Sequence, residues 1–182
     1  MGCTPSITLA GISFDCSDIA VGGLKRVLYT LLSDVTAVST AGGEITLAGD
    51  VTIALTKTAE LEFNNKDGFS AFSEEKTVEA NGVVNNVPTV VVEFPKMTTA
   101  KRLELDNITV AGLELVIWVQ TAADTYHAIG LDYGAYCSLV SGTSGTGRSE
   151  KNMYQVTFTG EEDSLSYTMT AASWATVVTS LV

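Results

Sequence analysis

Hydrophobic residues alternate with polar ones along much of this chain, instead of recurring every three or four positions as they do on one face of a helix. Alternation is clear in three neighbouring segments, 44–47, 51–56 and 60–63, and an Ala-Gly-Asp stretch that favours a turn separates the first two. A period of two is typical of strands with one buried face. We therefore expect these segments to form an antiparallel meander.

The same alternation appears near the C-terminus. Tyr154, Val156 and Phe158 alternate with polar residues, and after the acidic stretch 160–163 the pattern continues over 165–169. Two alternating segments separated by a short polar stretch are typical of a β-hairpin. The sequence therefore predicts a hairpin here.

Two segments in the middle of the chain read as a buried pair of strands. Leu113–Val119 carries apolar residues on both faces, which is typical of a central strand covered on each side. The segment 126–131 follows it after a polar turn, and we expect it to pair with this central strand. Trp118 and Trp174 both lie in apolar surroundings and are predicted to be buried.

One segment favours a helix. It follows Pro95, offers Thr98 as an N-cap and contains good helix formers such as Lys101, Leu103 and Glu104. We predict a single flanking helix over residues 98–107.

A long hairpin is predicted over residues 68–94, since Asn81-Gly82 provides turn chemistry and alternation follows it. This hairpin either extends beyond the body of the domain or forms an ordinary edge hairpin. Val90, Val92 and Phe94 form an apolar row on its second branch, and such a row needs a covering surface. We expect a neighbouring subunit to supply that surface, which makes these three residues the predicted oligomer interface.

The composition is compatible with one domain spanning residues 1–182. Hydrophobic residues make up 46% of the chain and charged residues only 17%, with a mean hydropathy of +0.26. Either a large core or apolar surface reserved for a partner explains this excess. Together with the alternation, these features predict a mainly β fold: an antiparallel β-sandwich or barrel with one flanking α-helix and a long β-hairpin.

Charge and cysteine content restrict the possible partners. The net charge of −11 opposes tight binding to nucleic acid. Three widely spaced cysteines indicate neither a disulfide framework nor a zinc site, and fit synthesis in a reducing cytoplasm. The sequence shows neither a secretory signal nor an apolar run of membrane-spanning length, so we expect no membrane partner.

No motif carries recognisable chemistry. The stretch 142–149 has the glycine spacing of a phosphate-binding loop, but Arg148 stands in place of the required lysine and strand periodicity follows at 153–159. His127 is the only histidine and lies in an apparent strand, and the acidic residues at 161–163 read as a solvated turn. We therefore expect a protein without catalytic residues, cofactors or bound metal, and not an enzyme.

Short motifs are spread along most of the chain: Cys3, 9–12, 15–16, 21–25 and 99–104. With these motifs, the sequence resembles small virion proteins encoded by phages and prophages of Bacteroides-type bacteria. Among virion proteins, the predicted layout is similar to that of tail tube subunits. The motifs are structural in character, so the resemblance concerns the kind of protein and not a catalytic site.

The resemblance to tail tube subunits implies homo-hexameric rings that stack into a tube in the phage tail, beside other virion proteins, with DNA passing through without specific binding. The bore would then be rich in Asp and Glu from the polar faces of strands such as 44–47 and 59–63. Two alternatives remain: another virion component, such as a connector or terminator ring or a capsid decoration or head-fibre base protein, and a non-viral β-sandwich binding module with a ligand cleft.

Overall fold

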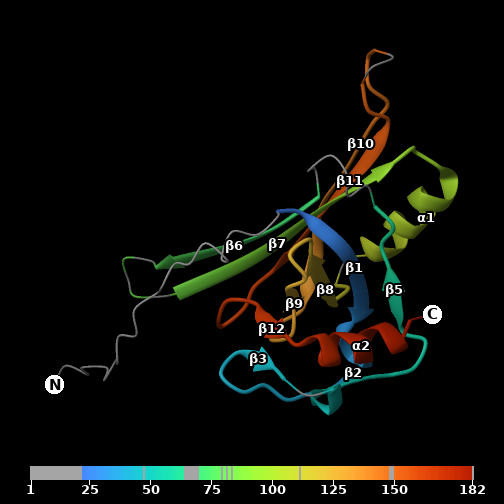
Figure 1. Cartoon of the computed structure of the whole chain (residues 1–182). Coiled ribbons are helices and arrows are strands. Elements are labelled where there is room, and N and C mark those ends of the chain that lie inside the picture. Colours follow the sequence, from blue (N-terminus) through green and yellow to red (C-terminus); the bar gives the residue numbers. More distant parts are fainter. Residues whose placement is uncertain are drawn as a thin grey trace.

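The computed structural model describes residues 22–46, 48–63, 70–78, 80, 82, 84–110, 112–147 and 150–181 (Figure 1). The strands are β1 (Leu24–Leu31), β2 (Val35–Val38), β3 (Glu44–Ile45), β4 (Val51–Ile53), β5 (Thr58–Glu60), β6 (Ala71–Val78), β7 (Val84–Pro95), β8 (Leu115–Thr121), β9 (Tyr126–Ile129), β10 (Ala135–Thr143), β11 (Met153–Gly160) and β12 (Tyr167–Met169). The helices are α1 (Thr99–Ile108) and α2 (Ala171–Thr179), with short 3-10 turns at Leu32–Asp34 and Ala48–Asp50.

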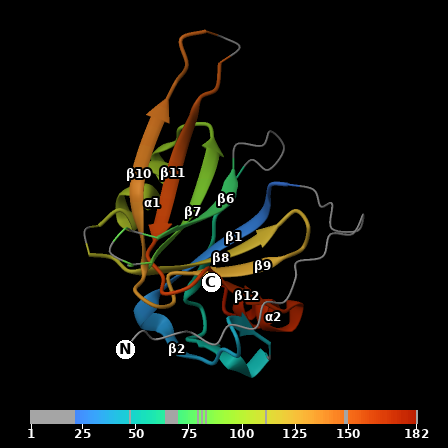
Figure 2. The same ribbon diagram turned by 90° about the vertical axis from the view of Figure 1, so that its left-hand side faces the viewer.

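Most strands belong to one large sheet, in the order β3-β12-β9-β8-β10-β11-β7-β6, with β1 pairing β8 and β5 pairing β1 beside this path. Among the described strands, every strand-to-strand pairing is antiparallel except that of β3 with β12, and β2 and β4 form a separate pair. The fold is thus mainly β, as the alternation predicts. The described strands do not close into a barrel, because the path ends at β3 and at β6. Figures 1 and 2 show the sheet twisting strongly, as chiral strands require.

The predicted central strand is confirmed. Leu115 to Gln120 of β8 are all buried, and β8 lies between β1 and β9. The indole N–H of Trp118 donates to the Thr30 hydroxyl at 3.0 Å, which satisfies the one polar group of this buried ring.

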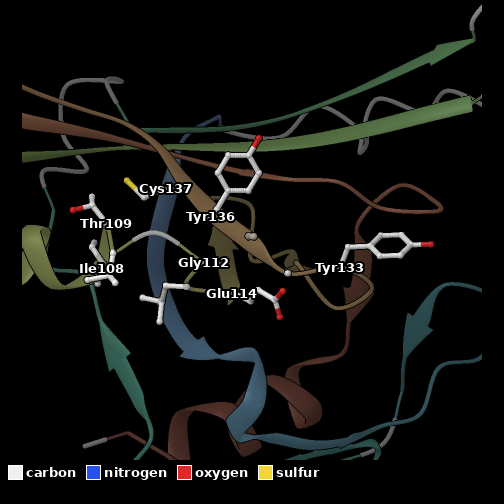
Figure 3. Close-up of a pocket in the computed structure, with 11 residues that line it drawn as sticks. Ile108, Thr109, Gly112, Glu114, Tyr133, Tyr136 and Cys137 are labelled. Atoms are coloured by element: carbon white, nitrogen blue, oxygen red, sulfur yellow. The ribbon is translucent and has the colours of Figure 1, made fainter.

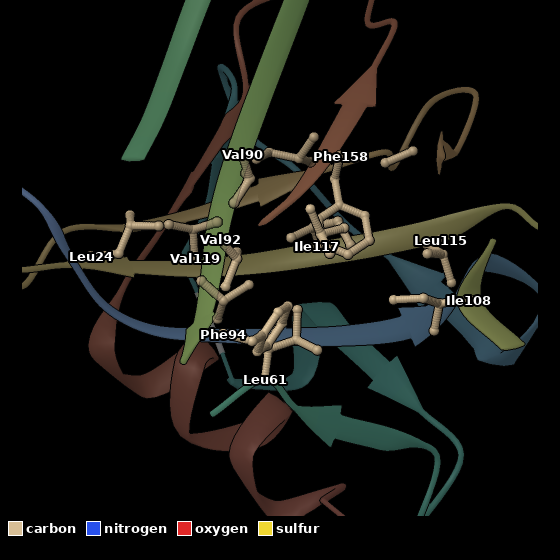
Figure 4. Packing of buried hydrophobic residues seen from close by; sticks show 14 of the residues in the cluster. Leu24, Leu61, Val90, Val92, Phe94, Ile108, Leu115, Ile117, Val119 and Phe158 are labelled. Carbon is tan, nitrogen blue, oxygen red and sulfur yellow. The ribbon is translucent and has the colours of Figure 1, made fainter. Parts of the chain in front are cut away.

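The two faces of β8 pack against two separate groups of apolar side chains. The first core lies on the face of Ile117 and Val119 and gathers side chains from β1, β7, β11 and α1 (Figure 4). The second core lies on the face of Val116 and Trp118, where α2 covers it. Alternation of side chains across one strand therefore organises both cores.

Val90, Val92 and Phe94 are buried within the first core, with exposed fractions of 0%, 0% and 6% (Figure 4). The chain's own residues, such as Leu61 and Phe158, supply the covering surface for this apolar row. The prediction that a neighbouring subunit covers these three side chains is therefore wrong. The row was correctly identified as needing a partner, but that partner lies within the same chain.

The predicted helix is confirmed as α1, one residue displaced at each end. The Thr98 hydroxyl accepts a hydrogen bond from the Lys101 backbone N–H at 3.3 Å, as expected of an N-cap. The second helix, α2, was not predicted; Thr170 caps it, and Trp174 and Val177 turn toward the second core. In the described part of the chain, no helix is long and apolar enough to cross a lipid bilayer.

Two predicted strand pairings are wrong. The C-terminal hairpin does not form, because β11 lies between β10 and β7 whereas β12 pairs β9 and β3. The meander does not form either, since β3, β4 and β5 pair β12, β2 and β1 respectively. Alternation correctly indicates strands with a buried face, but these short strands are paired by their packing on distant parts of the chain.

Candidate self-assembly surface

The long predicted hairpin is confirmed as β6 and β7, and it forms a four-stranded antiparallel sheet with β11 and β10. The two outer strands of this sheet are staggered. Ala71 of β6 lies level with Leu139 of β10, because both are connected through the facing residues Val91 and Thr157. The β6–β7 hairpin therefore extends past one end of the sheet and the β10–β11 hairpin past the other (Figure 1).

We call residues 75–85 of the β6–β7 hairpin the arm. The hairpin is fixed to the body just before the arm begins. The Asn86 side-chain amide donates to the Glu162 carbonyl at 3.1 Å, the Glu162 N–H donates back to the Asn86 carbonyl, and the Ser166 N–H donates to the Glu74 carboxylate at 2.6 Å. Beyond these contacts the described residues of the arm are mostly exposed, Val78 by 69% and Val84 by 45%.

Strand β10 has one free edge. It pairs with β11 along its length, whereas on its other side the only pairing among the described strands joins Ala135 to Leu115 of β8. The segment Ala135–Thr143 contains no charged residue and no proline, and it is exposed from Ser138 onward. Proteins usually protect exposed edges with charges, proline or bulges. Here only a register shift between Cys137 and Leu139 interrupts the edge.

Strand β6 forms the opposite edge of the same sheet, and among the described strands it pairs only with β7. Its middle contains Glu74, Glu75 and Lys76. The two edges therefore differ: the β6 edge is charged and the β10 edge is not. Each edge offers backbone N–H and C=O groups for which a further strand is the natural partner.

A groove of about 340 Å³, lined by both polar and apolar residues, opens beside the start of β10, between this strand and the connection from α1 to β8 (Figure 3). Ile108 and Leu113 belong to or pack on the first core, and the outer residues Val110, Tyr133 and Tyr136 are exposed by 59%, 61% and 47%. Burial raises the pKa of the Cys137 thiol in this groove, which favours the neutral thiol. The exposed aromatic and aliphatic side chains of this groove are accessible to a partner.

A buried carboxylate lies where the base of the arm meets the turn between β9 and β10. The Glu162 carboxylate accepts hydrogen bonds from the backbone N–H groups of Gly130, Leu131 and Asp132, the latter two at 3.3 Å. Burial raises the pKa of Glu162 to about 7. The nearby Asp132 carboxylate adds to this rise in pKa, and the hydrogen bond from the Gly130 N–H opposes it. Through its carboxylate and its backbone, Glu162 therefore links the base of the arm to the turn between β9 and β10.

The sequence predicts no catalytic residues, and His127 is the one histidine that could have served as a general acid or base. His127 lies half-buried in β9, with Nδ1 3.2 Å from the Ser166 hydroxyl and its ring packed on Phe72. Burial lowers the pKa of His127. Among the described residues, no three His, Cys, Asp or Glu side chains are grouped so that they could hold a metal ion.

The glycine-rich stretch at 142–149 does not have the geometry of a phosphate loop in its described part. It begins inside β10, and the next element is β11, not a helix. The Thr146 backbone N–H and hydroxyl both donate to the Glu150 carboxylate, so that an acid of the chain itself occupies this turn.

Comparison of the chain with protein families, with curated proteins and with solved structures finds no match. The most prominent surface features of the described residues are the two free strand edges and the groove beside β10.

Proposed function

We propose that this protein is a structural, non-enzymatic subunit of a bacteriophage tail tube, which associates edge to edge into homo-hexameric rings that stack to form a conduit for DNA. The observation that carries the proposal is the pair of unlike free edges on the sheet β6-β7-β11-β10. A second copy can place its β6 against β10 of the first and so satisfy the unpaired backbone groups of both strands.

Joining unlike edges has a geometric consequence. The contact is heterologous, because β10 of one copy meets β6 of the next, and each added copy again offers both edges. Such head-to-tail contacts give closed rings when the rotation between copies closes, and open filaments when it does not. An edge-to-edge protein of this kind is thus suited to a ring-forming role, which agrees with the tail tube resemblance.

The charge of the chain is compatible with a conduit for DNA. With a net charge of −11, six copies carry a large excess of acidic side chains. Phosphates would find few cations on which to release counterions, so DNA could pass without adhering. Acid-rich bore residues remain a prediction of this proposal.

Electron microscopy of the concentrated protein by negative staining tests the proposal. Tubes or six-membered rings are the expected result. Rings of another symmetry that never stack would favour a connector or terminator, and particles that stay monomeric at every attainable concentration would refute the proposal.

A charged variant identifies the edge. Leu139→Glu together with Ser141→Glu adds two acids to the exposed and otherwise uncharged β10 edge, and charged side chains on an edge strand disfavour pairing with a further strand. We expect at least tenfold weaker self-association in sedimentation velocity, with an unchanged circular dichroism spectrum. A matched control, Leu55→Glu with Thr52→Glu, adds the same two charges to exposed residues far along the chain and should assemble normally.

A further inference from the structure

Residues 161–166, which connect β11 to β12, fasten the base of the β6–β7 hairpin to the turn between β9 and β10. Within this connection only Glu162 and Ser166 are buried, with exposed fractions of 5% and 6%. Both residues hydrogen-bond to the hairpin. The Glu162 N–H donates to the Asn86 carbonyl. The Ser166 N–H donates to the Glu74 carboxylate at 2.6 Å. We call residues 161–166 the clasp.

Glu162 contacts both of the parts that the clasp joins. On the side of the hairpin, its carbonyl accepts a hydrogen bond from the Asn86 side-chain amide at 3.1 Å. On the side of the β9–β10 turn, its carboxyl group accepts hydrogen bonds from the consecutive backbone N–H groups of Gly130, Leu131 and Asp132. A displacement of the Glu162 side chain from the turn therefore also acts on the backbone that pairs with Asn86.

The Glu162 carboxyl group lies against a second carboxyl group. It hydrogen-bonds to the side chain of Asp132. The Asp132 carboxylate also accepts hydrogen bonds from the Tyr167 hydroxyl at 2.9 Å and from the Asp163 N–H at 3.2 Å, which hold it in place. Among the described residues, no lysine or arginine forms an ion pair with either carboxyl group. Two carboxyl groups hydrogen-bond to each other only while one of them carries a proton, so the closed clasp holds a proton.

We infer that the clasp is a proton-dependent fastening: a proton shared by Glu162 and Asp132 keeps the hairpin base attached to the β9–β10 turn, and loss of this proton releases it. Without the proton, two negative charges would face each other at a buried site, where desolvation and like-charge repulsion both disfavour ionised carboxylates. The Glu162 side chain would then move into water. This movement withdraws the acceptor from the Gly130 N–H and loosens the pairing with Asn86. The clasp lies within one copy, so the inference does not depend on the proposed function.

The direction of the pH dependence follows from the two states of Glu162. In the closed clasp, burial together with Asp132 raises the pKa of Glu162 to about 7, whereas a carboxyl group that opening exposes to water has the ordinary value of 4.5. Between these two values, opening of the clasp releases a proton, so a rise in pH favours the open state. The open fraction should therefore increase between about pH 4.5 and pH 7 and then level off.

Asn86 lowers the cost of releasing the hairpin base. This residue is 1% exposed, and its side-chain oxygen Oδ1 accepts no hydrogen bond from the described residues. A buried acceptor without a donor is unfavourable, and water removes that penalty when it reaches the atom. Opening the clasp exposes Oδ1 to water, which offsets part of the loss of the hydrogen bond from the Asn86 amide to Glu162.

The other titratable groups around the clasp do not produce the same pH dependence. His127 lies beside Ser166, with Nδ1 3.2 Å from the hydroxyl, and burial lowers its pKa. Since the closed clasp favours the neutral ring, His127 would open the clasp as the pH falls, which is the opposite direction. Burial raises the pKa of Tyr167 to about 12, and a hydrogen bond to Asp163 raises the pKa of Tyr133, so both hydroxyls keep their protons at neutral pH. The remaining charged groups that face the clasp are the carboxylates of Glu74 and Asp163.

Hydrogen–deuterium exchange followed by mass spectrometry tests the inference, because the donors at the clasp include the backbone N–H groups of Gly130 and Glu162. After correction for the intrinsic exchange rate, protection of these two amides should fall by roughly tenfold or more between pH 5 and pH 8. Exchange there should depend little on added urea, since a local opening exposes little surface. Amides of the central strand β8 should instead become strongly urea-dependent, because they exchange through global unfolding.

Two variants with side chains of nearly unchanged size test the shared proton. Glu162→Gln keeps an acceptor for the Gly130 N–H and a donor for Asp132 at every pH, so its protection should not change with pH. Asp132→Asn removes the second charge and should leave the clasp better protected than in the parent at pH 8. Glu150→Gln, at another carboxylate that accepts a backbone N–H within a turn, is the control and should behave like the parent.

Each outcome decides for or against the clasp. Protection of Gly130 and Glu162 that is the same at pH 5 and pH 8 in the parent would refute the inference. A pH dependence in Glu162→Gln equal to that of the parent would assign it to another group and would also refute the inference. If Asp132→Asn is folded by circular dichroism but no better protected than the parent at pH 8, Asp132 is only a hydrogen-bond partner and the shared proton is refuted. If Asp132→Asn does not fold, the comparison of Glu162→Gln with the parent decides alone.

Discussion

Replacing Glu162 with glutamine should change how the stability of the protein depends on pH. Glu162 is 5% exposed, and its pKa is raised from the ordinary value of 4.5 to about 7. Between these two values, the folded protein retains a proton that the unfolded chain has already lost. The stabilisation that results is complete below about pH 4.5 and is lost as the pH rises through 7.

The size of this effect follows from the two pKa values. The difference between 4.5 and about 7 corresponds to roughly 3 kcal/mol at about 1.36 kcal/mol per pKa unit. We take roughly 2 kcal/mol as the expected effect, because the surrounding polar groups and nearby solvent screen the charge of the carboxylate. A glutamine side chain at this position would keep an acceptor for the Gly130 N–H and could donate to Asp132, but it cannot ionise. Relative to the parent, Glu162→Gln should therefore gain roughly 2 kcal/mol in free energy of unfolding between about pH 5 and pH 8.

Urea denaturation at several pH values, with the difference between variant and parent plotted against pH, measures this gain. The difference removes the contributions of titrating groups that do not interact with Glu162. Glu150→Gln serves as a control, because hydrogen bonds from Thr146 lower the pKa of Glu150. Its difference from the parent should fall with rising pH only below about pH 4.5 and stay flat between pH 5 and pH 8. A difference between Glu162→Gln and the parent that stays flat or falls with rising pH would refute the reasoning.

Two further substitutions test the fold. Phe158→Ala empties a fully buried site in the first core and should lower the free energy of unfolding by roughly 3–5 kcal/mol in chemical denaturation. Gly130→Ala should abolish or severely weaken folding in the same assay, since the residue has φ +85° and an added Cβ would overlap the Ala135 nitrogen and the Leu115 oxygen. Gly23→Ala also meets positive φ but open space, and should cost much less, so equal losses at both glycines would contradict this explanation.

Local sequence signals predict those elements whose cause is local. The helix α1 is found from its Thr98 cap, and β8 is found because both of its faces are apolar. The second helix is missed because its sequence is rich in Thr and Val, which favour strands, although Thr170 and the helical spacing of Trp174 and Val177 were available as signals. Here packing on the second core outweighs intrinsic propensity.

The partners of strands and surfaces could not be predicted in the same way. Alternation tells which face of a strand is buried, but it does not tell what covers that face. For this reason Val90, Val92 and Phe94 are recognised as an apolar row and yet assigned to the wrong partner. The uncharged β10 edge does have a sequence signal, nine residues without charge or proline, but only the topology shows that it is an edge.

The β6–β7 hairpin combines two roles that meet at Asn86. On the body side of Asn86, Val90 and Val92 are core residues. Replacing the whole segment 70–92 with a short link would therefore unfold the protein and would reveal nothing about assembly. On the far side of Asn86, the described residues of the arm are exposed, because the hydrogen bonds to Glu162 and Ser166 are made by Asn86 and Glu74 at its base.

Joining Lys76 to Asn86, which face each other, by a two-residue Asn-Gly turn removes only the outer part of the hairpin. Such a shortened chain should keep the stability of the parent and lose self-association in size-exclusion chromatography. Loss of folding would instead show that the arm stabilises the body, and unchanged assembly would place the contact between copies elsewhere.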